Sequence, residues 1–190
     1  FLADTGGVPP AQGDKCQWNE DLGPKAGVGS CPAGSYDPDL FGDLPVSCVD
    51  WCDADAYCRW AGKRLCGRIG GGGLSNENFE PWDEGVSQWY NACSDGGRLV
   101  FPYGDRYEEG RCNGPEAERD GPWEVGSEGA CSGLFAPYDG LFDMSGNVAE
   151  WEDTCSTAEG GGARDAMIGF WDRCIPMLRW SKTAAIATLT

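Results

Sequence analysis

The sequence contains no histidine and has few basic residues. The absence of histidine removes the most common general base and the most common zinc and copper ligand. Fourteen lysine and arginine residues stand against 31 aspartate and glutamate residues, so the formal net charge is −17. An acidic chain of this kind argues against nucleic acid or anionic lipid as the main partner. It favours a cation or a basic protein partner.

Long hydrophobic runs are also absent, so neither a signal peptide nor a membrane span is visible. The 190 residues suit one domain of ordinary size, and a hydrophobic content of 41% indicates a folded protein. Thirty glycines and 12 prolines predict many loops and little regular structure.

Cysteine is abundant, with 11 residues and no C-x-x-C pair. Disulfides are therefore expected rather than a zinc site, and they place the protein in an extracytoplasmic compartment: periplasmic, cell-surface or secreted. The odd number leaves at least one cysteine without a partner inside the chain.

Two helices are predicted from their capping residues. Asp50 is a good N-cap for a helix over 51–61, and Ser87 can cap a shorter helix that ends near Cys93. Residues 99–103 alternate weakly and predict a short strand. Together these elements favour an irregular, loop-rich α+β domain.

Residues 1–44 are rich in glycine, proline and aspartate and show little periodicity. They predict an extended, loop-dominated arm, with Cys16 and Cys31 as the cysteines that would pin it. The domain proper is then expected over 45–190.

The chain is organised around residues 138–155, which read YDGLFDMSGNVAEWEDTC. The pair Gly146-Asn147 predicts a turn with an unusual backbone conformation, and Asp143 and Glu150 flank it. Acidic side chains and turn carbonyls together suit a hard cation such as calcium. A capped turn with two solvated acids is the alternative.

Four further segments accompany this stretch in order: PVSCVDWCDADAYCRWAGKRL, SQWYNACSDGGRLVFPYGD, RCNG and WEVGS. Together with GLFDMSGNVAEW, they resemble the formylglycine-generating enzyme and sulfatase-modifying factor family. The resemblance covers residues 45–151. It implies a C-type-lectin-like fold with two helices beside small antiparallel sheets.

The resemblance also implies two structural calcium sites, in which side-chain and backbone oxygens surround each ion. Active members bind copper through two neighbouring cysteines near the C-terminus. The corresponding region, 168–180, holds only Cys174. Copper is therefore not expected, since two soft ligands are the minimum for a tight Cu(I) site.

The first of the two calcium sites that the resemblance implies would comprise Asp143, Gly146, Val148 and Glu150, and the second Asn113, Gly114, Asp120 and Pro122.

The family's disulfide plan implies a bridge between Cys93 and Cys174. It also leaves Cys58 as the odd thiol, or bonded outside this sequence, because the family's final cysteine-bearing strand is not found. Either the chain is then incomplete, or the open sheet edge is covered by another polypeptide or by a segment such as 184–189.

These observations predict a non-catalytic, calcium-stabilised, disulfide-rich binding domain or accessory subunit with a protein partner in an extracytoplasmic assembly. An active copper-dependent formylglycine-generating oxidase is one alternative. A carbohydrate-binding module is another, although the Glu-Pro-Asn and Gln-Pro-Asp loops of sugar-binding C-type lectins do not occur.

Overall fold

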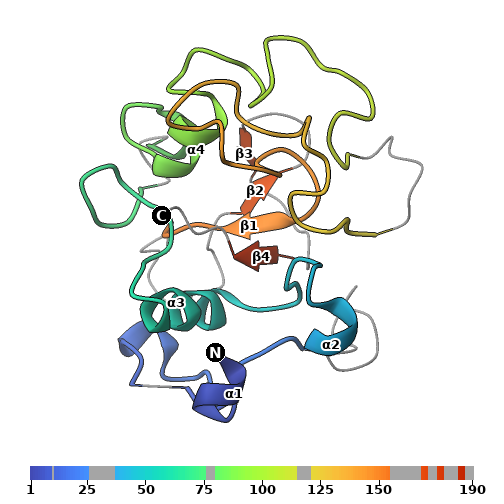
Figure 1. Cartoon of the computed structure of the whole chain (residues 1–190). Helices are drawn as coiled ribbons and strands as arrows, with labels where there is room; N and C mark the ends of the chain where they lie inside the picture. Colours follow the sequence, from blue (N-terminus) through green and yellow to red (C-terminus); the bar gives the residue numbers. More distant parts are fainter. Residues whose placement is uncertain are drawn as a thin grey trace.

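The computed structural model describes residues 1–9, 11–25, 37–75, 80–114, 121–154, 168–170, 175–177 and 184–186. Short helices and a small sheet are joined by long loops (Figure 1). This confirms the loop-rich α+β architecture. No helix in these residues is long and apolar enough to cross a membrane. The elements are α1 (Leu2–Thr5), η1 (Asp14–Cys16), α2 (Pro38–Phe41), α3 (Trp51–Trp60), η3 (Glu80–Trp82), α4 (Gln88–Cys93), β1 (Ala149–Trp151), β2 (Ile168–Phe170), β3 (Ile175–Met177) and β4 (Ala184–Ile186).

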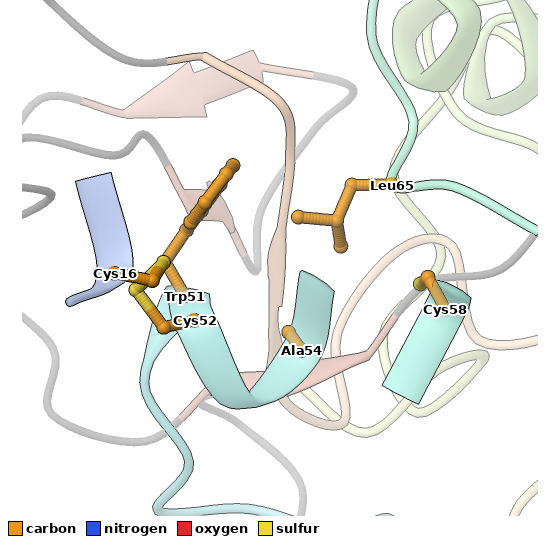
Figure 2. Packing of buried hydrophobic residues seen from close by; sticks show 6 residues of the cluster. All are labelled: Cys16, Trp51, Cys52, Ala54, Cys58 and Leu65. Carbon is orange, nitrogen blue, oxygen red and sulfur yellow. A yellow bond between two sulfur atoms is a disulfide. The ribbon is translucent and has the colours of Figure 1, made fainter. Parts of the chain in front are cut away.

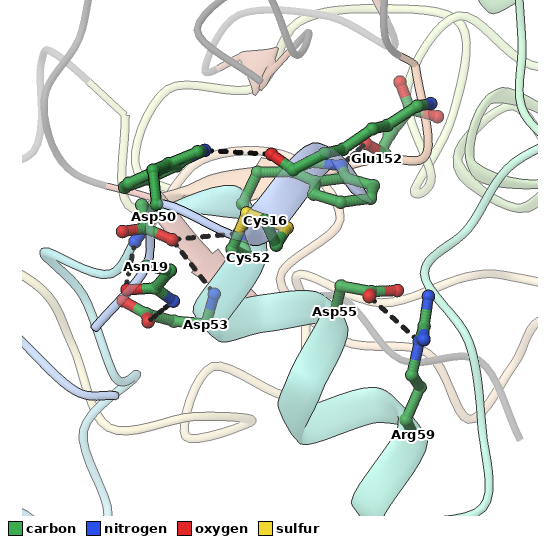
Figure 3. Close-up of a disulfide and its surroundings, with 11 residues drawn as sticks. Cys16, Asn19, Asp50, Cys52, Asp53, Asp55, Arg59 and Glu152 are labelled. Carbon is green, nitrogen blue, oxygen red and sulfur yellow. Dashed lines mark hydrogen bonds and ion pairs between the residues drawn. A yellow bond between two sulfur atoms is a disulfide. The ribbon is translucent and has the colours of Figure 1, made fainter. Parts of the chain in front are cut away.

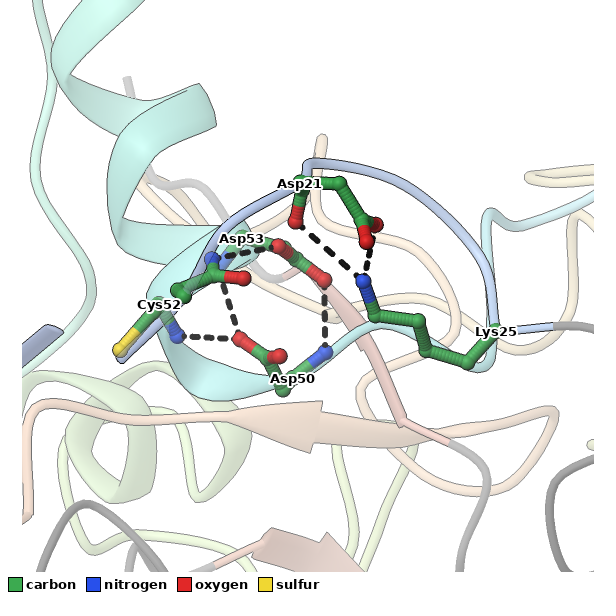
Figure 4. Close-up of polar contacts among 6 residues, drawn as sticks. Asp21, Lys25, Asp50, Cys52 and Asp53 are labelled. Carbon is green, nitrogen blue, oxygen red and sulfur yellow. Dashed lines mark hydrogen bonds and ion pairs between the residues drawn. The ribbon is translucent and has the colours of Figure 1, made fainter. Parts of the chain in front are cut away.

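Helix α3 begins at the predicted residue. The Asp50 carboxylate accepts hydrogen bonds from the backbone N–H groups of Cys52 and Asp53, and the Asp53 carboxylate accepts one from the Asp50 N–H (Figure 4). This reciprocal capping box satisfies N–H groups that have no partner within the helix. On the inner face of the helix Ala54 and Cys58 are fully buried, at 0% exposure, and Tyr57 is half-buried.

Helix α4 also begins as predicted. The Ser87 hydroxyl accepts a hydrogen bond from the Tyr90 N–H at 3.1 Å, and the helix ends at Cys93. Trp89 and Cys93 are buried and belong to one hydrophobic cluster with Cys66 and Met144. The cluster therefore joins α4 to the signature stretch, residues 138–155.

The four described strands form one mixed sheet in the order β3-β2-β1-β4 (Figure 1). β1 pairs antiparallel with β2, and β2 with β3. The β1–β4 pairing is parallel, so the expectation of purely antiparallel sheets was wrong. The segment proposed to cover an open edge does take a strand position, because Ala184–Ile186 lies along β1.

The predicted strand over 99–103 is reduced to one bridge between Phe101 and Gly104. Pro102 and Tyr103 form the turn of this bridge, so the chain reverses before a ladder can grow. Phe101 and Tyr103 instead pack in a small core with the disulfide Cys112–Cys131.

A third core forms where the arm meets α3 (Figure 2). Two tryptophan side chains tie α3 and the segment before it to β1. Trp51 donates to the Glu152 carbonyl at 2.8 Å, and Trp151 donates to the Val49 carbonyl at 3.0 Å. The cluster in Figure 2 comprises Cys16, Trp51, Cys52, Ala54, Cys58 and Leu65.

The N-terminal arm is more ordered than predicted, since it carries α1, η1 and α2. Cys16 bonds to Cys52 of α3 and so pins the arm to the domain, whereas Cys31, the other cysteine expected to pin the arm, lies outside the described residues (Figure 3). Asn19 reinforces this attachment by donating a buried hydrogen bond to Asp53 at 2.9 Å. Helix α3 presents Cys52 and Asp53 next to each other, which lets the arm bond to both.

Candidate metal centre and adjoining cavity

The turn at Gly146-Asn147, the signature turn, has the unusual backbone that its sequence predicts, with φ values of 87° and 61°. Asp143, which flanks it, also has a positive φ, of 58°. A Cβ at Gly146 would lie 2.6 Å from the Asn113 carbonyl oxygen, so glycine is required for both its conformation and its space. The Asn147 N–H donates to the same carbonyl at 2.8 Å. The turn is therefore fixed against the segment that carries Asn113.

In the first predicted calcium site, here called the first cage, each of the two acidic residues accepts a hydrogen bond from a protein N–H group with one carboxylate oxygen. Asp143 Oδ2 accepts from the Gly126 N–H at 2.7 Å, and Glu150 Oε2 accepts from the Trp89 indole N–H. Among the residues with described positions, neither second oxygen has a hydrogen-bond partner. Each carboxylate thus keeps one oxygen available for a cation.

Electrostatics supports this interpretation. The pKa of Glu150 is raised to about 7, mainly by burial and to a smaller extent by the negative charge of Asp143, against the opposing hydrogen bond from Trp89. Burial also raises the pKa of Asp143, with a smaller upward effect from Glu128. The charge of Asp143 therefore acts on Glu150, and no basic residue in the described part of the chain lowers the pKa of either carboxyl.

Asp143, Val148 and Glu150 line one cavity of about 970 Å³. Its walls come from the arm, from residues 44–49, from α3 and from the signature stretch. The described lining contains three acidic residues and no lysine or arginine. The described lining residues are Phe1, Leu2, Ala3, Gly23, Pro24, Leu44, Pro45, Val46, Val49, Asp53, Tyr57, Cys66, Trp89, Val125, Gly126, Gly140, Leu141, Phe142, Asp143, Met144, Asn147, Val148 and Glu150.

The second predicted cage is described only in part, because Asp120 lies outside the described residues. Asn113 is buried, whereas Pro122 is exposed. The Asn113 amide nitrogen donates to the Gly121 carbonyl at 3.0 Å and to Asn147 Oδ1 at 3.2 Å. The structure thus connects the second segment to the signature turn. Gly114 is half-buried beside Asn113.

Sequence reasoning treated Asn147 only as a turn residue and missed its connecting role. Its side chain accepts from the Trp123 N–H at 2.8 Å and donates to the Trp123 carbonyl at 3.3 Å. These reciprocal bonds hold the 121–123 segment against the turn. The local sequence indicates the left-handed backbone of Asn147, but its partner lies 24 residues away.

Glu152 was not among the site residues predicted from the sequence. It is fully buried, and one of its carboxylate oxygens accepts from the Ser87 hydroxyl at 3.4 Å. The other, Oε2, has no hydrogen-bond partner in the described part of the chain. Burial raises the pKa of Glu152 to about 8, with a further contribution from Glu150. The available signal was strand alternation, which places Glu150 and Glu152 on the same face.

Across the described ranges, no three aspartate, glutamate or cysteine side chains gather into a metal-binding group. Each predicted cage takes part of its oxygen atoms from the backbone, so it depends on fewer side chains than such a group. Cys93 is disulfide-bonded, but Cys174 lies outside the described residues, and the Cys93–Cys174 pairing stays a prediction. Cys58 is buried and forms no disulfide within the described part of the chain, which is compatible with both expectations for it.

Comparison with protein families matches residues 11–182 to the sulfatase-modifying factor enzyme 1-like domain. The chain therefore belongs to this family. The inactive C-alpha-formylglycine-generating enzyme 2 of Mus musculus is 31% identical over 159 residues, which cover 78% of this chain and 40% of that protein. The protein of the same name in Bos taurus is 30% identical over 149 residues, covering 73% and 38%. The chain thus spans about two fifths of the length of these relatives.

Proposed function

We propose that this chain is a non-catalytic domain of the sulfatase-modifying factor type, stabilised by calcium and disulfides, which acts as a binding domain or accessory subunit. The observation that supports it best is the pair of carboxylates Asp143 and Glu150. They line one cavity, lack a basic partner among its described residues, and keep one oxygen each for a cation.

Calcium suits these residues. It accepts carboxylate and carbonyl oxygens together, and the cage would combine Asp143 and Glu150 with the carbonyls of Gly146 and Val148. The second site would draw on Asn113, Gly114, Asp120 and Pro122. The ion's role is structural: it would neutralise the two acids and tie the signature turn to β1.

The absence of catalysis is inferred from the sequence. The C-terminal region that would hold a pair of copper-binding cysteines has Cys174 alone, and the chain contains no histidine. A single soft ligand does not make a tight Cu(I) site. Two relatives whose names include the word inactive are consistent with this proposal.

An extracytoplasmic location and a protein partner complete the proposal. The bonds Cys16–Cys52 and Cys112–Cys131 are compatible with an oxidising compartment. The net charge of −17 favours a partner with a basic surface. Native pull-down with the full-length protein would identify a stable partner, and a protein that elutes alone at every salt concentration would contradict the accessory role.

Calcium binding is tested by calorimetry and by thermal unfolding with and without a chelator. Calcium at about 100 times its dissociation constant would add about 2.7 kcal/mol, which corresponds to about 5–10 °C in melting temperature for a chain of this size. Asp143→Asn and Glu150→Gln should abolish this gain. The matched control Asp139→Asn removes an exposed acid from the same stretch and should keep it.

Absence of heat in the calcium titration, together with a melting temperature that the chelator does not change, would refute the calcium proposal. The catalytic proposal has its own test, in which a peptide with a sulfatase-type cysteine motif is incubated with the protein, copper and oxygen. We expect no aldehyde above background. Aldehyde formation would show that the chain is an active oxidase.

A further inference from the structure

The cavity beside the cage is larger than a metal ion needs, and most of its wall is apolar. Leu44, Val46 and Val49 contribute one part of the wall, and Leu141 and Val148 another. Its volume of about 970 Å³ lies at the upper end of the range in which proteins bind small organic molecules. A hydrated ion gains nothing from contact with such walls.

The charged side chains that line the cavity are all acidic among its described residues. Asp53, Asp143 and Glu150 line it, and no lysine or arginine does. Both carboxylate oxygens of Asp53 already accept hydrogen bonds, one from the Asn19 amide and one from the Asp50 N–H at the start of α3. Asp143 and Glu150 are therefore the groups that can attract a positive charge into the cavity.

Aromatic side chains stand in the same wall. Tyr57, Trp89 and Phe142 line the cavity, and Trp89 donates its indole N–H to Glu150. Aromatic faces attract organic cations, most strongly where water is excluded. The cavity wall thus offers both carboxylates and aromatic side chains to an organic cation.

We propose that this cavity binds an amphiphilic organic cation, a small molecule with an alkyl or aryl body and one ammonium head group. The ammonium lies against Asp143 and Glu150, and the apolar body occupies the space between residues 44–49 and 141–148. This site goes beyond the proposed function, because it needs no calcium. Since both ligands use the same two carboxylates, calcium and the organic cation exclude each other.

Other ligand classes fit less well. An anionic amphiphile would place its charge beside Asp143 and Glu150, which disfavours binding. A sugar would offer many hydroxyl groups to a largely apolar wall and leave several of them without partners. The sign of the head group is therefore the property that the experiment must vary.

Calorimetric titration of the intact protein tests the proposal at pH 8, above the pKa of Glu150, in the presence of a chelator. The probe is octyltrimethylammonium at concentrations below micelle formation, compared with octanoate and octanol, which have the same chain length. We expect octyltrimethylammonium to bind at least tenfold more tightly than either. Addition of calcium should weaken it.

The variants are chosen to keep the fold. Asparagine tolerates the left-handed backbone of Asp143, and glutamine at position 150 still accepts from Trp89. Asp143→Asn and Glu150→Gln should each weaken octyltrimethylammonium binding at least tenfold. Val46→Trp keeps both acids and should block binding by filling the cavity. The control Asp139→Asn should bind as the unmodified protein does.

Equal affinity for octyltrimethylammonium and octanoate would overturn the proposal, as would unchanged binding in Val46→Trp. Failure of this site is distinguishable from failure of the calcium proposal. A protein that binds calcium but not octyltrimethylammonium retains the cage and loses only the organic ligand. A protein that binds octyltrimethylammonium but not calcium has the organic-cation site and lacks the calcium site.

Discussion

The disulfide between Cys16 and Cys52 is predicted to make the N-terminal arm part of the cooperative fold. The bond joins residues separated by 36 positions. By the chain-entropy relation, a closed loop of this length restricts the unfolded chain by about 4 kcal/mol at 25 °C. The double variant Cys16→Ala/Cys52→Ala should lose this amount.

Contacts around the bond explain why the loss should affect the whole fold. Phe1 packs on Tyr57 and Trp60 of α3, with ring centroids 5.6 Å and 5.7 Å away. Asn19 bonds to Asp53, and the half-cystine at Cys52 is fully buried. The arm therefore shares one core with α3 and should not unfold separately from it.

Guanidinium unfolding, followed by tryptophan fluorescence with the other disulfides intact, measures the effect. The midpoint should fall, and the dependence of free energy on denaturant should stay the same or rise, because the unfolded chain without the bond is less compact. The matched control is Cys112→Ala/Cys131→Ala, whose separation of 19 residues predicts a loss of about 3 kcal/mol. A loss below about 1 kcal/mol for the Cys16–Cys52 pair, or a separate early transition, would show that the arm is an independent attachment.

Two further predictions concern α3. Asp50→Ala removes the capping box of this helix and should lower the free energy of unfolding by about 1–2 kcal/mol in a thermal melt. Asp50→Asn should retain most of this stability, because asparagine is also a good N-cap. Equal losses in the two variants would contradict the capping role. The Cys58 thiol should not react with iodoacetamide at pH 8 in the folded protein, because burial and the charge of Asp55 raise its pKa to about 11. It should be labelled in denaturant, where its pKa returns to the ordinary value, and rapid labelling of the folded protein would show that α3 opens.

Local sequence determined the helix starts and the signature turn. Asp50 and Ser87 accept hydrogen bonds from N–H groups at most three residues away, so a capping pattern is visible without any tertiary information. The same holds for Gly146-Asn147, whose left-handed backbone follows from residue type. The family segments were also readable in order, and they led to the correct family.

Only the tertiary structure determined which distant residues pair with each other in disulfides and in the sheet. Nothing near Cys16 indicates Cys52 as its partner, because disulfide choice depends on which cysteines the fold brings within bonding distance. The parallel pairing of Ala184–Ile186 with β1 is likewise a contact between distant segments. Strand propensity cannot give its direction, since the same residues fit either ladder.

For the candidate site, too, the sequence determined some features and the tertiary structure determined others. The sequence placed Asp143 and Glu150 beside one turn, since they lie within eight positions of each other. It did not show that Asn147 joins the turn to Trp123, or that Glu152 is buried. Nor did it show the cavity, whose walls come from segments more than 100 residues apart. Residue types determine which groups can bind a cation, but only long-range packing determines which of them share a wall and lose contact with water.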